Sequence, residues 1–276
     1  MDTSLIDKRD RLHRVLETME RVLIGYSGGV DSTFLMASAH EALGDRAWAV
    51  TAVSPSLARR ELDEARSIAR RFGWNHETVR TREVSQEEYA RNDSDRCYHC
   101  KVELFEVLAP KARTLHAEIA VGTNTDDLGD YRPGLRAARE RGVRAPLVEA
   151  ELSKADVREL SGSLGLPTAD KPSSPCLASR FAYGVRVTAE GLRRVERAEE
   201  IVRSHGFDVL RVRDHGDLAR IEVPVEDVPR AAALQDEIFP ALRALGFRYV
   251  TLDLAGFRSG SLNAVLQPPH IGSPPE

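Results

Sequence analysis

The three cysteines of this chain are the residues best suited to unusual chemistry. Two of them form a Cys-x-x-Cys motif, Cys97-Tyr98-His99-Cys100, and the third is Cys176. Three cysteines are too few, and an odd number, to form the disulfide framework of a secreted protein. In a reducing compartment they suggest a metal site or catalysis. Three thiolates can hold a 4Fe-4S cluster through three irons and leave the fourth iron open to a sulfide or a substrate.

The same spacing has two other interpretations. Zinc would take the three cysteines and a histidine such as His99, although the position of His99 between Cys97 and Cys100 makes simultaneous ligation awkward. A redox dithiol is the second, but nothing around the motif suggests a thioredoxin-like fold. The spacing alone leaves a cluster, a zinc site and plain thiols open.

Cys176 lies in a polar, loop-forming stretch, SSPCLASR at residues 173–180. The flanking serines and prolines make a position in an apolar core unattractive for this cysteine. Lys171 and Arg180 are expected to lower the pKa of the thiol and to favour the nucleophilic thiolate. We therefore predict that Cys176 is catalytic.

A second motif, SGGVDS, follows the short apolar run 22–26, which we expect to be a buried strand, and precedes a helix expected over 33–43. Glycines permit close backbone approach, amides at a helix N-terminus attract phosphate, and the hydroxyls add hydrogen bonds. Asp31 could hold Mg²⁺. The predicted nucleotide-binding residues of this loop are Ser27, Gly28, Gly29, Asp31 and Ser32.

This loop fits neither a Walker A motif nor a dinucleotide fingerprint, and it resembles the PP-loop of ATP pyrophosphatases. The resemblance implies cleavage of ATP between the α- and β-phosphates, so that a carbonyl or carboxylate oxygen is adenylated. An ordinary turn capped by Asp31 is the alternative. Gly122 and Thr123, after an expected strand at 118–121, would supply a second ligand loop at the same sheet edge, with a capped surface turn as the alternative.

Further strands are expected at 47–53 and 77–79, and helices at 61–72, 103–115 and 156–164. This alternation predicts an α/β fold with a parallel, Rossmann-like sheet covered on both faces, of the PP-loop, adenine nucleotide alpha hydrolase-like kind. Ligands collect at the carboxyl ends of such strands, where both glycine loops fall.

The run KPSSP at 171–175 breaks regular structure and marks a domain junction. We predict a PP-loop ATP pyrophosphatase domain over 1–175 and a smaller α+β domain for substrate binding and oligomerisation over 176–276. The second domain should contain a helix at 189–204, a hairpin of 209–213 with 219–223, and a strand at 249–254.

The charge and composition of the chain indicate which kinds of partner it binds. The chain has 276 residues with 39 basic against 43 acidic, a formal net charge of -4, so nothing favours a nucleic acid. The charged N-terminal stretch is unlike a signal peptide, and no apolar stretch has membrane-spanning length. We expect a cytoplasmic protein that acts on a small molecule.

Taken together, these motifs and three further stretches resemble the LarE family of sulfur transferases over nearly the full length. The additional stretches are DYRPGL at 130–135, RVR at 211–213 and TLDLAGFRSG at 251–260. The resemblance implies that ATP, with Mg²⁺, adenylates a carboxylate of pyridinium-3,5-biscarboxylic acid mononucleotide and that sulfur then displaces AMP. Pyrophosphate and AMP are released, and the thiocarboxylate serves the nickel-pincer cofactor of lactate racemase.

In the best-known form of this family, the cysteine matching Cys176 gives up its own sulfur and becomes dehydroalanine, and the positions matching Cys97 and Cys100 are not cysteines. This chain instead resembles a three-cysteine branch, in which a 4Fe-4S cluster on Cys97, Cys100 and Cys176 carries the sulfide. The resemblance also implies a homo-oligomer and leaves room for a sulfur-donor protein.

By position within the family, Ser179, Arg211 and Arg213 would hold the substrate phosphate, which suits bidentate guanidinium chemistry. A solvated strand face is the alternative for the two arginines. Weaker candidates for metal or substrate contacts, each of which could instead pair with an arginine, are Glu199, Glu222 and Asp253.

Other functions remain for a PP-loop protein. An enzyme that thiolates tRNA should show a basic face, and an amidating synthetase usually needs a glutaminase partner or domain that supplies ammonia. An ATP-binding regulator would keep the loop without chemistry and would have no need of a thiol at position 176.

Overall fold

A computed structural model of the chain describes residues 3–129 and 133–258. The chain divides into two compact units, residues 1–90 with 94–176 and residues 91–93 with 177–276. Among the residues described, no helix is long and apolar enough to cross a membrane. The roles assigned above to residues 1–175 and 176–276 stay predictions.

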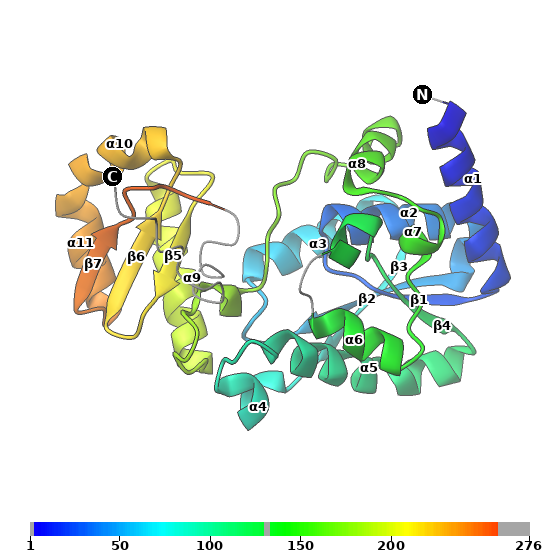
Figure 1. Cartoon of the computed structure of the whole chain (residues 1–276), viewed down its shortest axis with the longest axis horizontal. Coiled ribbons are helices and arrows are strands. Elements are labelled where there is room, and N and C mark those ends of the chain that lie inside the picture. The colour runs from blue at the N-terminus through cyan, green and yellow to red at the C-terminus, as the bar shows by residue number, and fades with distance from the viewer. Residues whose placement is uncertain (1–2, 130–132, 259–276) are drawn as a thin grey trace, which may run out of the picture. The chain divides into compact units, whose positions relative to one another are not determined.

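The first unit carries a four-stranded parallel sheet in the order β3-β2-β1-β4 (Figure 1). Its strands are β1 (Val22–Gly25), β2 (Ala47–Val53), β3 (Asn75–Arg80) and β4 (Glu118–Val121). Its helices are α1 (Thr3–Thr18), α2 (Val30–Leu43), α3 (Arg59–Arg71), α4 (Glu87–Ala90), α5 (Arg96–Leu115), α6 (Pro133–Glu140), α7 (Pro146–Glu149) and α8 (Lys154–Ser163). The predicted parallel α/β fold is confirmed.

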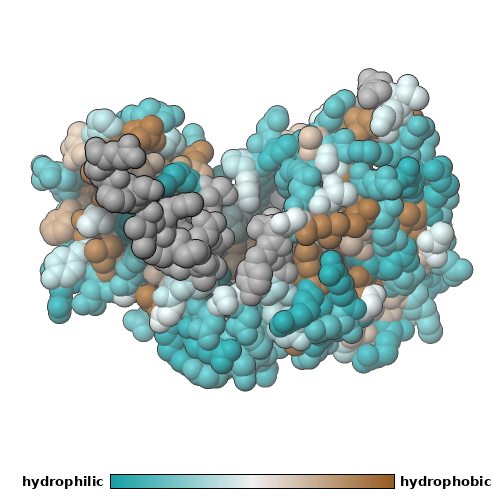
Figure 2. All heavy atoms as spheres, viewed as in Figure 1, coloured by the Kyte–Doolittle hydropathy of each residue, from teal (hydrophilic) through white to brown (hydrophobic). Residues whose placement is uncertain are grey.

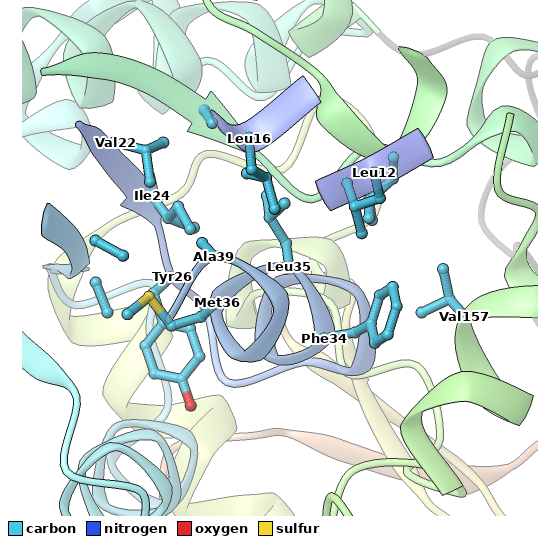
Figure 3. Close-up of a cluster of buried hydrophobic side chains, with 14 of the residues drawn as sticks. Leu12, Leu16, Val22, Ile24, Tyr26, Phe34, Leu35, Met36, Ala39 and Val157 are labelled. Carbon is cyan, nitrogen blue, oxygen red and sulfur yellow. The ribbon is translucent and has the colours of Figure 1, made fainter. Parts of the chain in front are cut away.

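Helices bury both faces of this sheet, which is why β1 is apolar at successive residues. Val22 and Ile24 pack into a core with side chains of α1, α2, α3 and α8. Leu23, which points the opposite way, packs with α5 and α6. Figure 3 shows Val22 and Ile24 beside Leu16 of α1, with Leu12 of the same helix farther along. The carboxyl ends of the strands are thereby fixed on a rigid frame.

The second unit is a smaller α+β unit, as predicted. Its sheet has the order β5-β6-β7, antiparallel between the first pair and parallel between the second. The strands are β5 (Arg211–Asp214), β6 (Leu218–Glu222) and β7 (Tyr249–Leu252). The helices are α9 (Ala189–Ser204), α10 (Val228–Ala233) and α11 (Gln235–Ala244), and all three contribute to one core with the sheet.

Helices α2, α3, α5 and α8 all begin earlier than the sequence predicts, α5 by the widest margin. The helix expected from residue 103 starts at Arg96, because Cys100, Leu104 and Leu108 follow one another at four-residue spacing on the side that packs inward. The helix after the phosphate loop starts at Val30 instead of residue 33. Polar side chains cover much of the surface visible in Figure 2, so these buried faces account for the apolar content.

Candidate active site

The predicted phosphate loop lies at the carboxyl end of β1, where the chain turns into α2. The Ser27 and Ser32 hydroxyl oxygens are 3.0 Å apart, and the Ser32 hydroxyl donates to the Gly29 carbonyl at 3.2 Å. The Gly29 amide donates to the Ser27 hydroxyl at 3.3 Å. These bonds fold the loop around the first turn of α2, where the helix has amides without partners inside the helix and attracts anions.

Two glycines allow backbone segments to approach this loop. Gly28 has a φ of +71°, and a Cβ there would lie 2.9 Å from the Cβ of Ala65 in α3. A Cβ on Gly122, directly after β4, would lie 2.8 Å from the amide nitrogen of Ser32. The two predicted ligand loops, after β1 and after β4, are therefore in direct backbone contact.

Asp31 joins the same two loops through its carboxylate. One oxygen accepts a hydrogen bond from the Asn124 side chain at 3.1 Å, and the other pairs with the Lys154 ammonium. Thr123 stands between Gly122 and Asn124 in the second loop. Magnesium binding by Asp31 stays a prediction, and it would require Lys154 to give way.

Lys154 was not singled out from the sequence, although a signal was present. It is the first residue of α8, where the positive end of the helix dipole disfavours a cation. A lysine at that position indicates an acid in tertiary contact, and Asp31 is that acid. Asn124, which lies inside the predicted second loop, adds the side-chain bond to Asp31.

All three cysteines belong to the first unit. Cys97 and Cys100 lie in the first two turns of α5, and Cys176 ends the unit. Cys97 and Cys176 are exposed and Cys100 is half-buried. Desolvation, and next the negative charge of Cys176, raise the pKa of the Cys100 thiol to about 12.

The described residues do not present these thiols as a finished metal site. Across 3–129 and 133–258, no group of three or more His, Cys, Asp and Glu side chains could hold a metal ion. The His99 ring nitrogen lies 3.2 Å from the Asp95 carboxylate, so this histidine is engaged with an acid. In their present conformations, these described side chains form neither the ligand set of a 4Fe-4S cluster nor that of a zinc site.

A buried acid that the sequence did not reveal lies near Cys100. Glu83 is 2% exposed and accepts hydrogen bonds from the Ser56 hydroxyl, at 2.9 Å, and from the Ser54 hydroxyl. Desolvation raises the pKa of Tyr89, and the charges of the nearby cysteines add to that effect. Ser54 and Ser56 follow β2 and Glu83 follows β3, so position at a carboxyl strand end was the available signal.

The two cations expected to activate Cys176 are both engaged with acids. The Lys171 ammonium is 2.8 Å from Glu61, and the Arg180 guanidinium is 2.8 Å from Glu199. Their effect on the reactivity of the thiol stays a prediction.

In the second unit, Ser179 and Arg213 lie together. The Arg213 guanidinium donates to the Ser179 carbonyl at 3.0 Å and pairs with Glu222 at 2.7 Å. Arg211, on the same strand, is 9% exposed. Desolvation, and next the charge of Arg180, lower the pKa of Arg211 to about 10. Buried guanidiniums crowded in this way would gain from a bound anion.

The three acids named as weaker candidates all pair with arginines. Glu199 forms a two-bond pair with Arg180, at 2.8 and 3.1 Å. Glu222 pairs with Arg220, at 3.0 Å, as well as with Arg213, and Asp253 lies 3.6 Å from Arg220. In the structure Glu199 and Glu222 therefore balance buried arginines, while Asp253 lies near the partly exposed Arg220, and metal or substrate contacts stay predictions.

Comparisons with known proteins agree with this geometry. Residues 10–106, which include the phosphate loop, match the asparagine synthase family. One subunit of the glutamine-hydrolysing GMP synthase of Pyrococcus horikoshii is 28% identical over 214 residues, 70% of this chain and 68% of that protein. The parallel sheet and the loop after β1 define a PP-loop protein of the ATP-utilising class.

Two relatives match over nearly the whole chain. An uncharacterised protein of Synechocystis sp. is 47% identical over 267 residues, 95% of this chain and 99% of the relative. The pyridinium-3,5-bisthiocarboxylic acid mononucleotide synthase of Lactiplantibacillus plantarum is 38% identical over 265 residues, 95% of this chain and 96% of the synthase. The chain belongs to the LarE family of PP-loop sulfurtransferases.

Proposed function

We propose that this protein uses ATP to convert a carboxylate of pyridinium-3,5-biscarboxylic acid mononucleotide into a thiocarboxylate, a step in the biosynthesis of the nickel-pincer cofactor of lactate racemase. The Lactiplantibacillus relative is named a pyridinium-3,5-bisthiocarboxylic acid mononucleotide synthase, which supports this product. The observation that carries the proposal is an exposed thiol, Cys176, in the same unit as the phosphate loop. Activation of an acid and delivery of sulfur need these two groups.

The first step activates the carboxylate. A carboxylate oxygen attacks the α-phosphorus of ATP, the bond from that phosphorus to the pyrophosphate oxygen breaks, and pyrophosphate leaves with its electron pair. Ser27, Gly28, Gly29 and Ser32 would hold the phosphates through amides and hydroxyls. Mg²⁺ supplies charge neutralisation when bound, with Asp31 as its proposed ligand.

The second step forms the carbon–sulfur bond. A sulfur nucleophile attacks the acyl carbon, the bond to the phosphate oxygen breaks, and AMP leaves. Ser179, Arg211 and Arg213 would hold the phosphate of the mononucleotide, in line with the crowding of guanidiniums around Arg211. With a sulfide as the nucleophile, the product is a thiocarboxylate. With Cys176 as the nucleophile, the product is a thioester, and the thiocarboxylate is released when a base removes the Cα proton of Cys176 and the Cβ–S bond breaks. The second carboxylate is converted in a further round, which on the Cys176 route needs a second protein chain.

The sulfur comes either from Cys176 itself, which would become dehydroalanine, or from a sulfide on a cluster held by Cys97, Cys100 and Cys176. A sulfur-donor protein would then reload the cluster, and the protein would act as a homo-oligomer. The described residues contain no assembled metal-binding group, so the cluster route requires the thiols to converge.

Replacement of Cys176 by alanine tests the function. Protein purified without oxygen, given ATP, Mg²⁺ and the biscarboxylate mononucleotide, should release pyrophosphate and form thiocarboxylate detectable by mass spectrometry. Cys176→Ala should keep pyrophosphate release and lose at least 100-fold of thiocarboxylate formation. Persistent thiocarboxylate formation in this variant would refute the role of the thiol.

A double variant, Cys97→Ser with Cys100→Ser, separates the two sulfur sources. About four irons per chain and loss of turnover in the double variant would establish the cluster route. An iron-free protein whose mass falls by conversion of Cys176 to dehydroalanine, with the double variant still active, would establish the sacrificial route.

A further inference from the structure

Lys171 connects the phosphate loop, helix α3 and the segment that ends at Cys176. Its ammonium lies 2.8 Å from Glu61 and 3.0 Å from Glu64, both on α3. The same ammonium donates to the carbonyl of Gly28 in the phosphate loop at 3.2 Å. With an 11% exposed side chain, Lys171 is a largely buried cation at the meeting point of these elements.

A second set of bonds ties the same segment. The Ser174 hydroxyl donates to the other oxygen of Glu61 at 2.9 Å. Arg158 of α8 donates to the carbonyls of Ala169 and Lys171, the latter at 2.9 Å. The backbone is therefore fixed before Lys171, and side-chain bonds to Glu61 hold the chain as far as Ser174, two residues before Cys176.

Glu61 is ionised, as its bonds to Lys171 and Ser174 require. Desolvation alone would raise the pKa of Glu61, but the hydrogen bond and charge of Lys171, with the bond from Ser174, lower it below its usual value. The carboxylate is thus ionised at neutral pH and accepts both bonds at once.

Residues 172–176 are all exposed, so burial of apolar surface does little to order them. Polar bonds to α3 and to the loop contribute that order. A thiol that attacks an acyl adenylate has to be held near the activated carbon, because positioning accounts for a large part of the rate of such reactions. One of the bonds that Lys171 makes is to the loop that would bind the triphosphate.

We propose that Lys171 is a positioning residue that, through Glu61, fixes the Cys176 segment against the phosphate loop so that sulfur transfer follows adenylation. This inference rests on the proposed function, and it adds a residue whose task is separate from holding ATP or donating sulfur. Lys171→Met removes the bonds to Glu61, Glu64 and Gly28 and leaves the two carboxylates without the ammonium that lies between them. The segment should then lose its fixed position while the serines, glycines and amides of the phosphate loop remain.

Mobility of the segment can be measured directly. In the background of Cys97→Ser and Cys100→Ser, a nitroxide attached to Cys176 reports the motion of the chain by electron paramagnetic resonance. Lys171→Met should shorten the correlation time of the label at least threefold, and Lys171→Arg should restore it. Lys8→Met, which breaks a 2.7 Å ion pair with Asp156 elsewhere in the unit, is the matched control and should leave it unchanged.

The reaction supplies the second readout. With native cysteines, Lys171→Met should form at least tenfold less thiocarboxylate for each AMP released, since the acyl adenylate is lost to water. The ratio is the readout because loss of the bond to Gly28 also bears on the rate of AMP release. Ser174→Ala removes one bond to Glu61. It should change the label mobility and the yield of thiocarboxylate per AMP in the same direction as Lys171→Met, by a smaller amount. This variant tests the proposal if Lys171→Met does not fold.

An unchanged label mobility in Lys171→Met and Ser174→Ala, together with an unchanged yield of thiocarboxylate per AMP, would overturn the inference. If wild type makes no thiocarboxylate at all, the proposed function fails. The label still decides separately whether Lys171 holds the segment.

Discussion

The two proposed phosphate sites of this protein are built in opposite ways. The loop after β1 uses glycines, hydroxyls and amides, and its acid, Asp31, is already balanced by Lys154. The site on β5 uses the buried guanidiniums of Arg211 and Arg213. Backbone conformation therefore shapes the first site, and the balance of buried charge shapes the second.

This difference predicts where each site is fragile. A loop defined by close backbone approach should fail when an atom is added, because no side chain can move aside. A cluster of buried ions should fail when one partner is removed, because the remaining charge is left in a poorly solvated environment. Substitutions of these two kinds test whether the contrast is real.

The largest effect is expected in the second unit, for Glu222→Gln. The Glu222 side chain is 0% exposed and pairs with both Arg213 and Arg220. Loss of its charge leaves two guanidiniums without that partner, which should cost about 3 kcal/mol of unfolding free energy. Urea unfolding of the full chain, followed at neutral pH, measures the change.

An exposed pair provides the control for this variant. Arg144 and Glu149 lie on the surface of the first unit with side chains 30% and 34% exposed. Glu149→Gln should cost under about 1 kcal/mol, since exposed pairs contribute little. Equal losses of unfolding free energy in the two variants would mean that burial does not determine how much the Glu222 charge contributes to stability.

The next effect is expected in the phosphate loop, for Gly28→Ala. The added Cβ would lie 2.9 Å from the Cβ of Ala65, and the φ of +71° already disfavours a side chain. The loop must shift to relieve the contact, so affinity for a non-cleavable ATP analogue should fall about 100-fold, which is about 2.7 kcal/mol. Calorimetric titration measures this affinity.

Gly73→Ala separates the effect of backbone strain from the effect of a steric clash. Gly73 has a φ of +67° and no atom within 4 Å of the position of a Cβ. It should lose about 1 kcal/mol of stability through backbone strain alone and bind the analogue with unchanged affinity. A Gly28→Ala protein that binds like wild type would show that the loop is not held by its approach to α3.

The contrast also explains what the sequence could reveal. Residues 27–32 are contiguous and follow a recognisable buried strand, so the loop, the helix after it and the parallel sheet were predictable from local pattern. The start of α5 was missed, since its first turn carries a Cys-x-x-Cys motif whose periodicity is visible only with Leu104 and Leu108.

Partners that come from distant parts of the chain could not be predicted. Lys154 meets Asp31 across 123 residues, and Lys171 meets Glu61 across 110. Each of these residues is an ordinary charged residue in its own segment, and only the folded sheet edge brings the partners together. The arginines of β5 were recognised by family resemblance, while the carboxylates that balance them became evident from the fold.

The smallest effect is expected for Arg211→Met, and it should have the opposite sign in stability. Burial and the charges around it lower the pKa of Arg211 to about 10, so the folded protein disfavours this cation. Methionine keeps an apolar stem to pack near the ring of Phe257, which lies 5.1 Å from the guanidinium carbon. Removal of the charge should raise the unfolding free energy by about 1 kcal/mol.

Affinity for the mononucleotide should fall in the same variant, by roughly tenfold, if Arg211 holds its phosphate. The two measurements together distinguish a binding role from a structural one. A stabilised protein with weaker binding would show that the chain keeps a costly buried charge because the anion needs it. A destabilised protein with unchanged binding would mean that Arg211 belongs to the charge balance of β5, and the contrast between the two sites would then rest on Arg213 alone.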